Sequence, residues 1–254
     1  MTKIQAFLER IGLDPDTKIE HTYEFLKKIQ YASVTRIAYE NLDILEGKPL
    51  SLKNEDLFEK IVVRKRGGYC FELNGLLADI LEEMGFEVEH RFARYVRGEA
   101  DIPMRRHRIL TVTCEDGRYF CDIGVGDVAP KFPVKMEADL EQPQFEECYR
   151  FTKDEIHGWI LWDFHKGEWR RFVTFTEEKQ YDVDFIQPSF YCEAHPDSVF
   201  NKTPMLAIKT EKGRKAINDR EYKEFAGTDL VHLEENISDK RFSELLKQEF
   251  FLKY

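Results

Sequence analysis

Hydrophobic positions follow two different periods along the chain. Up to Gly85 they recur every three or four residues, which is the spacing of amphipathic helices. From Phe86 onward they alternate with polar residues, as expected for strands that bury one face. The first period predicts helices over residues 2–11, 23–30, 54–62 and 70–84.

Helix-breaking residues separate some of these helices. Gly47 and Pro49 interrupt residues 39–52, which we expect to be irregular. Ser51 is a candidate cap for the short helix that follows. The first part of the chain is therefore predicted to be mostly helical.

The alternating part predicts an antiparallel β region over about residues 86–190, curled into a barrel or a sandwich. Asp116 and Gly117 form a strong hairpin signal, and residues 163–167 could close a second hairpin. Strands are predicted at residues 86–92, 106–113, 118–126, 149–152, 159–164 and 169–174. Further along, strands are predicted at residues 205–210 and 215–218, and a closing helix at 242–251.

Composition narrows the class of protein. The chain has 254 residues, of which 42% are hydrophobic and 34% are charged, as in soluble globular proteins. It contains neither an apolar run that could span a bilayer nor an apolar signal peptide, so we expect a cytoplasmic protein without a membrane partner. Five cysteines without C-x-x-C spacing argue against a disulfide framework and against a structural zinc site.

The net charge of −10 argues against nucleic acid as a partner, because phosphate backbones require a basic surface. An anionic cofactor would need local basic groups. Residues 64–66 and the arginines at 105, 106 and 108 are the candidates, although we expect most of them to be solvated or paired with acids.

Cys70 is the first candidate for chemistry. It opens the predicted helix at 70–84, where free backbone N–H groups and the helix dipole favour a thiolate and lower the pKa of the thiol. Gly67 and Gly68 just before it could leave the sulfur exposed beside a cleft. A cysteine in this setting is a candidate nucleophile, whereas the alternative is an inert, buried thiol.

A candidate base and a candidate orienting acid follow on the predicted hairpin. His107 begins one strand, nine residues before Asp116, and Asp122 ends the next, five residues after Gly117. The hairpin would bring the two side chains together, either diagonally or with another strand between them. Cys70, His107 and Asp122 would then form a nucleophile, base and orienting group that need no metal.

Four motifs resemble those of the arylamine N-acetyltransferases. Residues 66–74 read Arg-Gly-Gly-Tyr-Cys-Phe-Glu-Leu-Asn, which is similar to the signature of that family. Residues 39–43 resemble its Phe-Glu-Asn-Leu segment, residues 122–126 resemble its Asp-Val-Gly-Phe-Gly, and residues 195–200 resemble its His-Pro-x-Ser-x-Phe. Their order and spacing resemble the family across nearly the whole chain.

The resemblance implies an α+β fold with a cysteine-protease-like Cys-His-Asp core. It implies a helical bundle at residues 1–85 that carries the cysteine, a β-barrel at 86–190 that carries the histidine and aspartate, and an α/β lid at 191–254. The implied reaction is a ping-pong acetyl transfer, typical of xenobiotic metabolism. Acetyl-CoA would be a co-substrate rather than a tightly bound cofactor, and aromatic amines or hydrazines would be the acceptors.

The same resemblance suggests further site residues. Gly124, Gly126 and Ser198 are candidates for contact with acetyl-CoA. The backbone N–H of Phe71, at the helix start, is the leading candidate for an oxyanion-stabilising donor.

Several positions depart from the family pattern. Val125 stands where the family usually has Phe, which predicts a roomier acceptor pocket, and Asp127 places an acid where a phosphate-bearing cofactor could pass. Ala38 and Ser33 replace a usual Pro and a common His, and neutral drift explains these two best. Two alternatives therefore stay open: a thiol-triad hydrolase or amide synthase with another acyl donor, and a weakly active CoA- or arylamine-binding protein. The sequence does not define the oligomeric state or the physiological amine.

Overall fold

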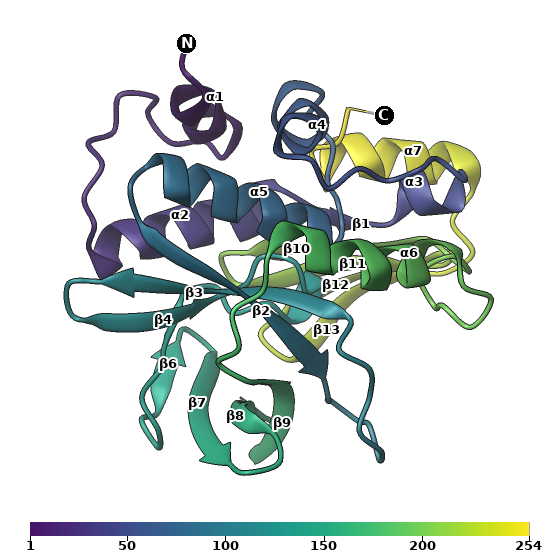
Figure 1. Cartoon of the computed structure of the whole chain (residues 1–254). Coiled ribbons are helices and arrows are strands. Elements are labelled where there is room, and N and C mark those ends of the chain that lie inside the picture. The colour runs from purple at the N-terminus through teal and green to yellow at the C-terminus, as the bar shows by residue number, and fades with distance from the viewer. Residues whose placement is uncertain (254) are drawn as a thin grey trace.

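A computed structural model describes residues 1–253 of the chain. It contains helices packed on an eight-stranded antiparallel sheet, which curls into a nearly closed barrel, and a second sheet of five strands near the C-terminus. In Figure 1, α1, α2 and α5 lie above strands β2–β4, and β6–β9 lie below them. The predicted α+β class is confirmed.

The helical part is built around α5 (Cys70–Glu83), in which all residues from Cys70 to Ala78 are buried. Its apolar side chains share one core with those of the first two helices and of β3 and β4. The other helical elements are α1 (Lys3–Arg10), α2 (Tyr23–Arg36), α3 (Leu42–Leu45), α4 (Asn54–Phe58) and a π-helical turn (Glu59–Val63). The predicted helices are present, and α2 is longer than predicted by about a turn and a half.

Ser51 does not cap α4. The N-cap position is Lys53, and the Ser51 hydroxyl donates to Asp56 Oδ2 at 2.6 Å while it accepts the Lys53 N–H at 3.3 Å. The serine therefore stabilises the turn that precedes the helix and does not cap the helix itself.

The barrel sheet has the strand order β5-β4-β3-β2-β9-β8-β7-β6. Cys114 pairs with Gly117 across the first predicted hairpin, and His165 pairs with Glu168 across the second. The strands are β2 (Glu87–Tyr95), β3 (His107–Cys114), β4 (Gly117–Cys121), β5 (Val134–Lys135), β6 (Gln142–Gln144), β7 (Glu147–Asp154), β8 (Gly158–His165) and β9 (Glu168–Phe175). Both hairpins are confirmed.

The five-stranded sheet has the order β1-β10-β11-β12-β13, so it recruits β1 (Tyr39–Glu40) from the helical part. Helix α7 (Asp239–Gln248) packs over it and shares a buried cluster with Leu42 of α3, as their proximity in Figure 1 also shows. The remaining strands are β10 (Met205–Thr210), β11 (Gly213–Asn218), β12 (Glu221–Ala226) and β13 (Asp229–Glu234).

Two expectations about these segments were wrong. Residues 39–52 are not wholly irregular, because β1 and α3 form there by pairing with β10 and packing under α7. The β region ends at Phe175 rather than near residue 190, since a short 3-10 turn (Asp182–Phe185) leads into α6 (Ile186–Ala194). Residues 1–253 contain no helix with the length and apolar character needed to cross a membrane.

A buried network of ion pairs lies beneath the segment that leads into α5. Arg66 pairs with Glu40 at 2.8 Å and with Asp43 at 3.1 Å. Lys60 bridges Asp43 at 2.8 Å and Glu72 of α5 at 2.7 Å. Charges buried to this extent are tolerated only when they are paired. The network therefore fastens β1, the π-helical turn and the start of α5 to one another.

Removing one charge from this network should destabilise the fold. Glu40, which is 1% exposed, also accepts the Leu42 N–H at 2.8 Å. We expect Glu40→Gln to lower the free energy of unfolding by about 3 kcal/mol, because it weakens a buried pair. Glu20→Gln is the matched control, since it removes an exposed pair with Lys18 and should cost less than about 1 kcal/mol. Urea unfolding measures both, and equal effects would contradict the prediction.

Candidate active site

Cys70 is the first residue of α5, and close packing of the backbone holds it there. A Cβ on Gly67 would lie 2.2 Å from the Ala38 carbonyl oxygen, and one on Gly68 would lie 2.9 Å from Glu72 Oε2. The Glu40 N–H donates to the Gly68 carbonyl at 2.9 Å. The two glycines thus allow β1 and Glu72 to approach closely, and neither has the positive φ that a flexible turn would require.

His107 and Asp122 form a buried pair. His107 Nε2 lies 2.6 Å from Asp122 Oδ2, and the aspartate is 0% exposed. The hairpin pairs Leu110 with Cys121, so Asp122 reaches His107 diagonally across β3 and the end of β4. This is one of the two arrangements that the residue counts allowed.

Asn74 holds the same aspartate from the helix side. Its Nδ2 donates to Asp122 Oδ1 at 2.8 Å and to the Arg108 carbonyl at 2.6 Å, and its Oδ1 accepts the Ile123 N–H at 2.9 Å. Asn74 is fully buried one helical turn after Cys70, on the same face of α5. Sequence reasoning missed this role, although the asparagine closes the signature motif and its spacing from the cysteine was the available signal.

The segment after Asp122 packs directly against the cysteine. The Gly124 N–H donates to Asp122 Oδ1 at 2.8 Å, and a Cβ on Gly124 would lie 2.6 Å from the Cα of Cys70. Gly126 has a φ of +70°, which favours glycine. Gly124 therefore sets the distance between the helix start and the barrel, while Gly126 turns the chain along the cavity beside it.

A cavity of about 550 Å³ contains the candidate nucleophile and base. Its wall includes Cys70, His107, Tyr39, Val125 and Phe200, together with Gly124 and Gly126. The side chains thus come from the helical part, the barrel and the C-terminal part of the chain. The cavity is the place where a substrate could meet the sulfur.

Ser198 lies behind this wall rather than in it. It is 0% exposed, its hydroxyl donates to the Cys192 carbonyl at 2.5 Å, and the same oxygen accepts the Phe200 N–H at 3.2 Å. These bonds hold the turn that presents Phe200 to the cavity. The serine thus shapes the cavity through its neighbours.

Burial raises the pKa of the Cys70 thiol well above its ordinary value, and the nearby Cys192 thiol adds to the rise. The backbone N–H groups of Arg108 and Phe71 act in the opposite direction without reversing it. The helix start was expected to lower this pKa, and the Phe71 N–H does act in that direction, but the net shift is upward because desolvation is the larger effect. A thiolate at Cys70 needs a positive charge beside it, and His107, which lines the same cavity, is one group able to supply it.

Most of the candidate basic residues are paired with acidic side chains. Arg108 is buried against Asp182 at 2.6 Å, and Arg105 faces Glu178 at 3.5 Å. Asp127, which raised doubt about an anionic cofactor, is paired with Arg214 at 2.9 Å. Arg106 is the one member of the two predicted basic groups that lines the cavity within residues 1–253.

No group of His, Cys, Asp and Glu in the described part of the chain has the arrangement of a metal site. All five cysteines are free thiols. A cysteine that shares a cavity with a histidine–aspartate pair is typical of enzymes that transfer acyl groups through sulfur.

Comparison with known proteins agrees with that class. A family model described as N-acetyltransferase matches residues 22–254. The arylamine N-acetyltransferase of Mycolicibacterium smegmatis is 39% identical over 231 residues, covering 85% of this chain and 79% of the relative. The solved structure of the Salmonella typhimurium arylamine N-acetyltransferase is similar with a TM-score of 0.93 and 27% identity, covering 99% of this chain and 92% of that one. The Mycobacterium marinum enzyme in complex with CoA has a TM-score of 0.89 and 30% identity, covering 98% and 92%.

The chain belongs to the arylamine N-acetyltransferase family. It is an arylamine N-acetyltransferase, which is an acyltransferase. The resemblance stated from the four motifs is thereby confirmed.

Loss of the hydrogen bonds that Asn74 makes should lower the rate of acetyl transfer. We expect Asn74→Leu, which keeps the volume, to lower kcat about 10- to 100-fold, because Asp122 loses a buried donor worth about 1–3 kcal/mol. KM for the acceptor should change little. Asn54→Leu is the control, since it removes a similar hydrogen bond to Asp79 between two residues that do not line the cavity. Steady-state kinetics decide, and a drop of the same size in the control would contradict a positioning role.

The reactivity of the Cys70 thiol should depend on pH differently when His107 is replaced. In His107→Gln no imidazolium can form beside the desolvated thiol, so thiolate forms only at higher pH. We expect its alkylation by iodoacetamide at pH 7 to slow about tenfold or more relative to the unmodified protein, and to recover as the pH rises. His157→Gln, which changes a histidine paired with Asp154, is the control. Identical pH profiles for His107→Gln and the unmodified protein would show that His107 does not stabilise the thiolate.

Proposed function

We propose that Cys70, His107 and Asp122 are the catalytic triad, and that the acetyl group passes through a thioester on Cys70. The observation that carries the proposal is the 2.6 Å pair between His107 Nε2 and Asp122 Oδ2 beside a cavity that also contains Cys70. The triad lies between residues 1–85 and 86–190, and residues 191–254 contribute the lid.

The pairing with Asp122 defines the tautomer of the base. The Nε2–H group donates a hydrogen bond to the carboxylate and keeps its proton. Nδ1 is therefore the ring atom left to receive the Cys70 proton. The resulting imidazolium supplies the positive charge that a buried thiolate requires. Asp122 stabilises that imidazolium and stays ionised.

The first half-reaction transfers the acetyl group to the enzyme. The Cys70 sulfur attacks the acetyl carbonyl, the carbon–sulfur bond to CoA breaks, and CoA leaves as a thiol after it takes up a proton. The Phe71 N–H, which acts to lower the pKa of the Cys70 thiol, is the proposed donor to the oxyanion.

The second half-reaction transfers the acetyl group to the acceptor and regenerates the free Cys70 thiol. An aromatic amine or hydrazine attacks the Cys70 thioester, the carbon–sulfur bond breaks, and the amide leaves. His107 takes the proton of the attacking nitrogen, and the sulfur is protonated again. Both half-reactions use one cavity, which is consistent with a ping-pong scheme.

The remaining cavity residues are assigned to the substrates. We place acetyl-CoA along Gly124 and Gly126, with Ser198 acting by shaping the lid. Val125 widens the acceptor pocket relative to the phenylalanine usual at this position. The cytoplasm is the proposed compartment, because Cys70 has to remain a reduced thiol.

Intact-mass analysis tests the proposal. The protein mixed with acetyl-CoA and no amine should gain one acetyl group, and peptide mapping should place it on Cys70. Adding an aromatic amine or hydrazine should remove it. Cys70→Ala should gain nothing, and the control Cys148→Ala, which changes a half-buried thiol, should behave as the unmodified protein does.

The opposite outcome has a defined meaning. If Cys70 stays unmodified in folded protein that still reacts with iodoacetamide, then the proposed acetyl-Cys70 intermediate is wrong. Labelling of Cys70 by another thioester or by an amide would then indicate a different acyl donor.

A further inference from the structure

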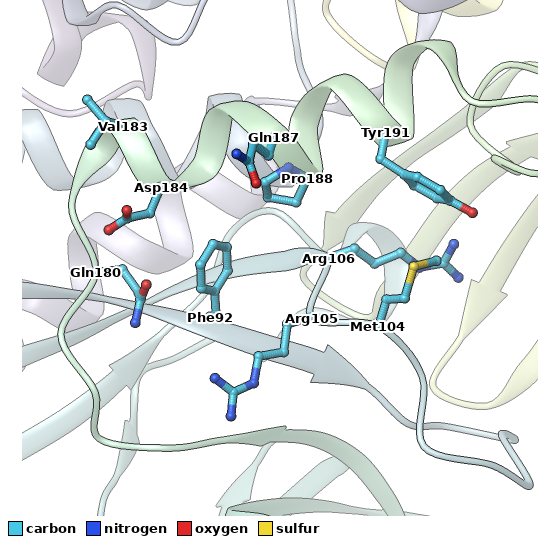
Figure 2. A pocket seen from close by; sticks show the side chains of 10 residues that line it. All are labelled: Phe92, Met104, Arg105, Arg106, Gln180, Val183, Asp184, Gln187, Pro188 and Tyr191. Atoms are coloured by element: carbon cyan, nitrogen blue, oxygen red, sulfur yellow. The ribbon is translucent and has the colours of Figure 1, made fainter.

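Arg106 lies in the walls of two cavities at once. It lines the 550 Å³ cavity with Cys70 and a neighbouring cavity of about 470 Å³ between α6 and the residues before β3. Figure 2 shows its side chain extending in the direction of Met104 and Tyr191, whereas that of Arg105 points away from them. The Arg106 carbonyl lies 3.9 Å from the Cys70 sulfur. Arg106 thus follows the chain past the candidate nucleophile, and its side chain lines the same cavity.

The guanidinium of Arg106 has no carboxylate partner among residues 1–253. The other charged residues of the cavity wall behave differently. Asp127 is paired with Arg214, Lys223 is paired with Glu221, and Glu99 is exposed at the rim. In a chain with a net charge of −10, an unpaired arginine beside the nucleophile is unusual.

The surroundings of Arg106 suit an aromatic ligand. Its guanidinium lies 5.9 Å from the centre of the Phe200 ring. Burial raises the pKa of Tyr39, another residue of the cavity wall, and the positive charge of Arg106 opposes that shift. Val125, a small side chain in the same wall, leaves room for a substituted ring.

We propose that Arg106 selects the acceptor by binding a carboxylate on its aromatic ring, so that aminobenzoate-type amines are the preferred acceptor class. The ring would pack against Phe200 and Tyr39, its carboxylate would accept hydrogen bonds from the guanidinium, and its amino group would face Cys70. A guanidinium binds a carboxylate through two parallel N–H donors, which fixes orientation as well as charge. This proposal rests on the proposed function and names its substrate class.

The experiment compares 4-aminobenzoate with its methyl ester, which has the same ring and amino group without the charge. For each protein the readout is the ratio of kcat/KM for the acid to that for the ester. We expect Arg106→Met to lower this ratio about tenfold or more, the size expected for a lost charge-assisted hydrogen bond. Arg106→Lys keeps the charge without the planar guanidinium, so its ratio should lie between that of the unmodified protein and that of Arg106→Met.

Arg105→Met is the matched control. It removes a neighbouring arginine that lines the other cavity and faces Glu178, and it should leave the ratio unchanged. A second readout needs no turnover: calorimetric titration with benzoate and methyl benzoate should show that the protein prefers the anion, and that Arg106→Met abolishes the preference.

Three outcomes would overturn the proposal. One is an equal loss on acid and ester, which indicates a structural role. Another is an unchanged ratio with slower acetylation of Cys70 by acetyl-CoA, which indicates that Arg106 contacts the phosphates of the donor. The third is benzoate binding that does not depend on Arg106. Failure of Cys70 to become acetylated would instead contradict the proposed function, and the titration would still decide the role of Arg106.

Discussion

The buried carboxylate of Asp122 is the constraint on which the site depends. A carboxylate with no exposed surface is tolerated only if its oxygens are matched by donors, and here His107, Asn74 and the Gly124 N–H supply them. These donors come from β3, from α5 and from the turn after β4. Satisfying one charge therefore sets the position of α5 on the barrel, and the geometry of the candidate site follows from the same bonds that hold the two parts together.

A second set of buried charges fixes the other side of the nucleophile. Glu72 accepts the Tyr69 N–H at 3.2 Å and pairs with Lys60, so the residue before Cys70 is tied to the ion-pair network under β1. The close approach of Gly67 to the Ala38 carbonyl leaves no room for a side chain between them. The signature motif is thus mainly a packing and charge-pairing device, and a single one of its residues carries the reactive atom.

The sequence predicted those parts of the site that depend on local pattern. Hydrophobic period and the Asp116-Gly117 turn were enough for α5, the β3–β4 hairpin and the meeting of His107 with Asp122. Partners far apart in sequence were not predictable in this way. The pairing of β1 with β10 and the buried amide of Asn74 depend on where other elements lie, and the raised pKa of Cys70 depends on burial that a helix start does not reveal.

The raised thiol pKa follows from the burial of Cys70. A desolvated site disfavours a lone thiolate, so the proposed mechanism draws the positive charge from His107, whose position is fixed by Asp122. That framework leaves the side chains at Val125 and Arg106 free of the bonds that hold the triad. In the proposed mechanism, acceptor choice therefore depends on these two side chains, while the thiol chemistry depends on the buried pair of His107 and Asp122.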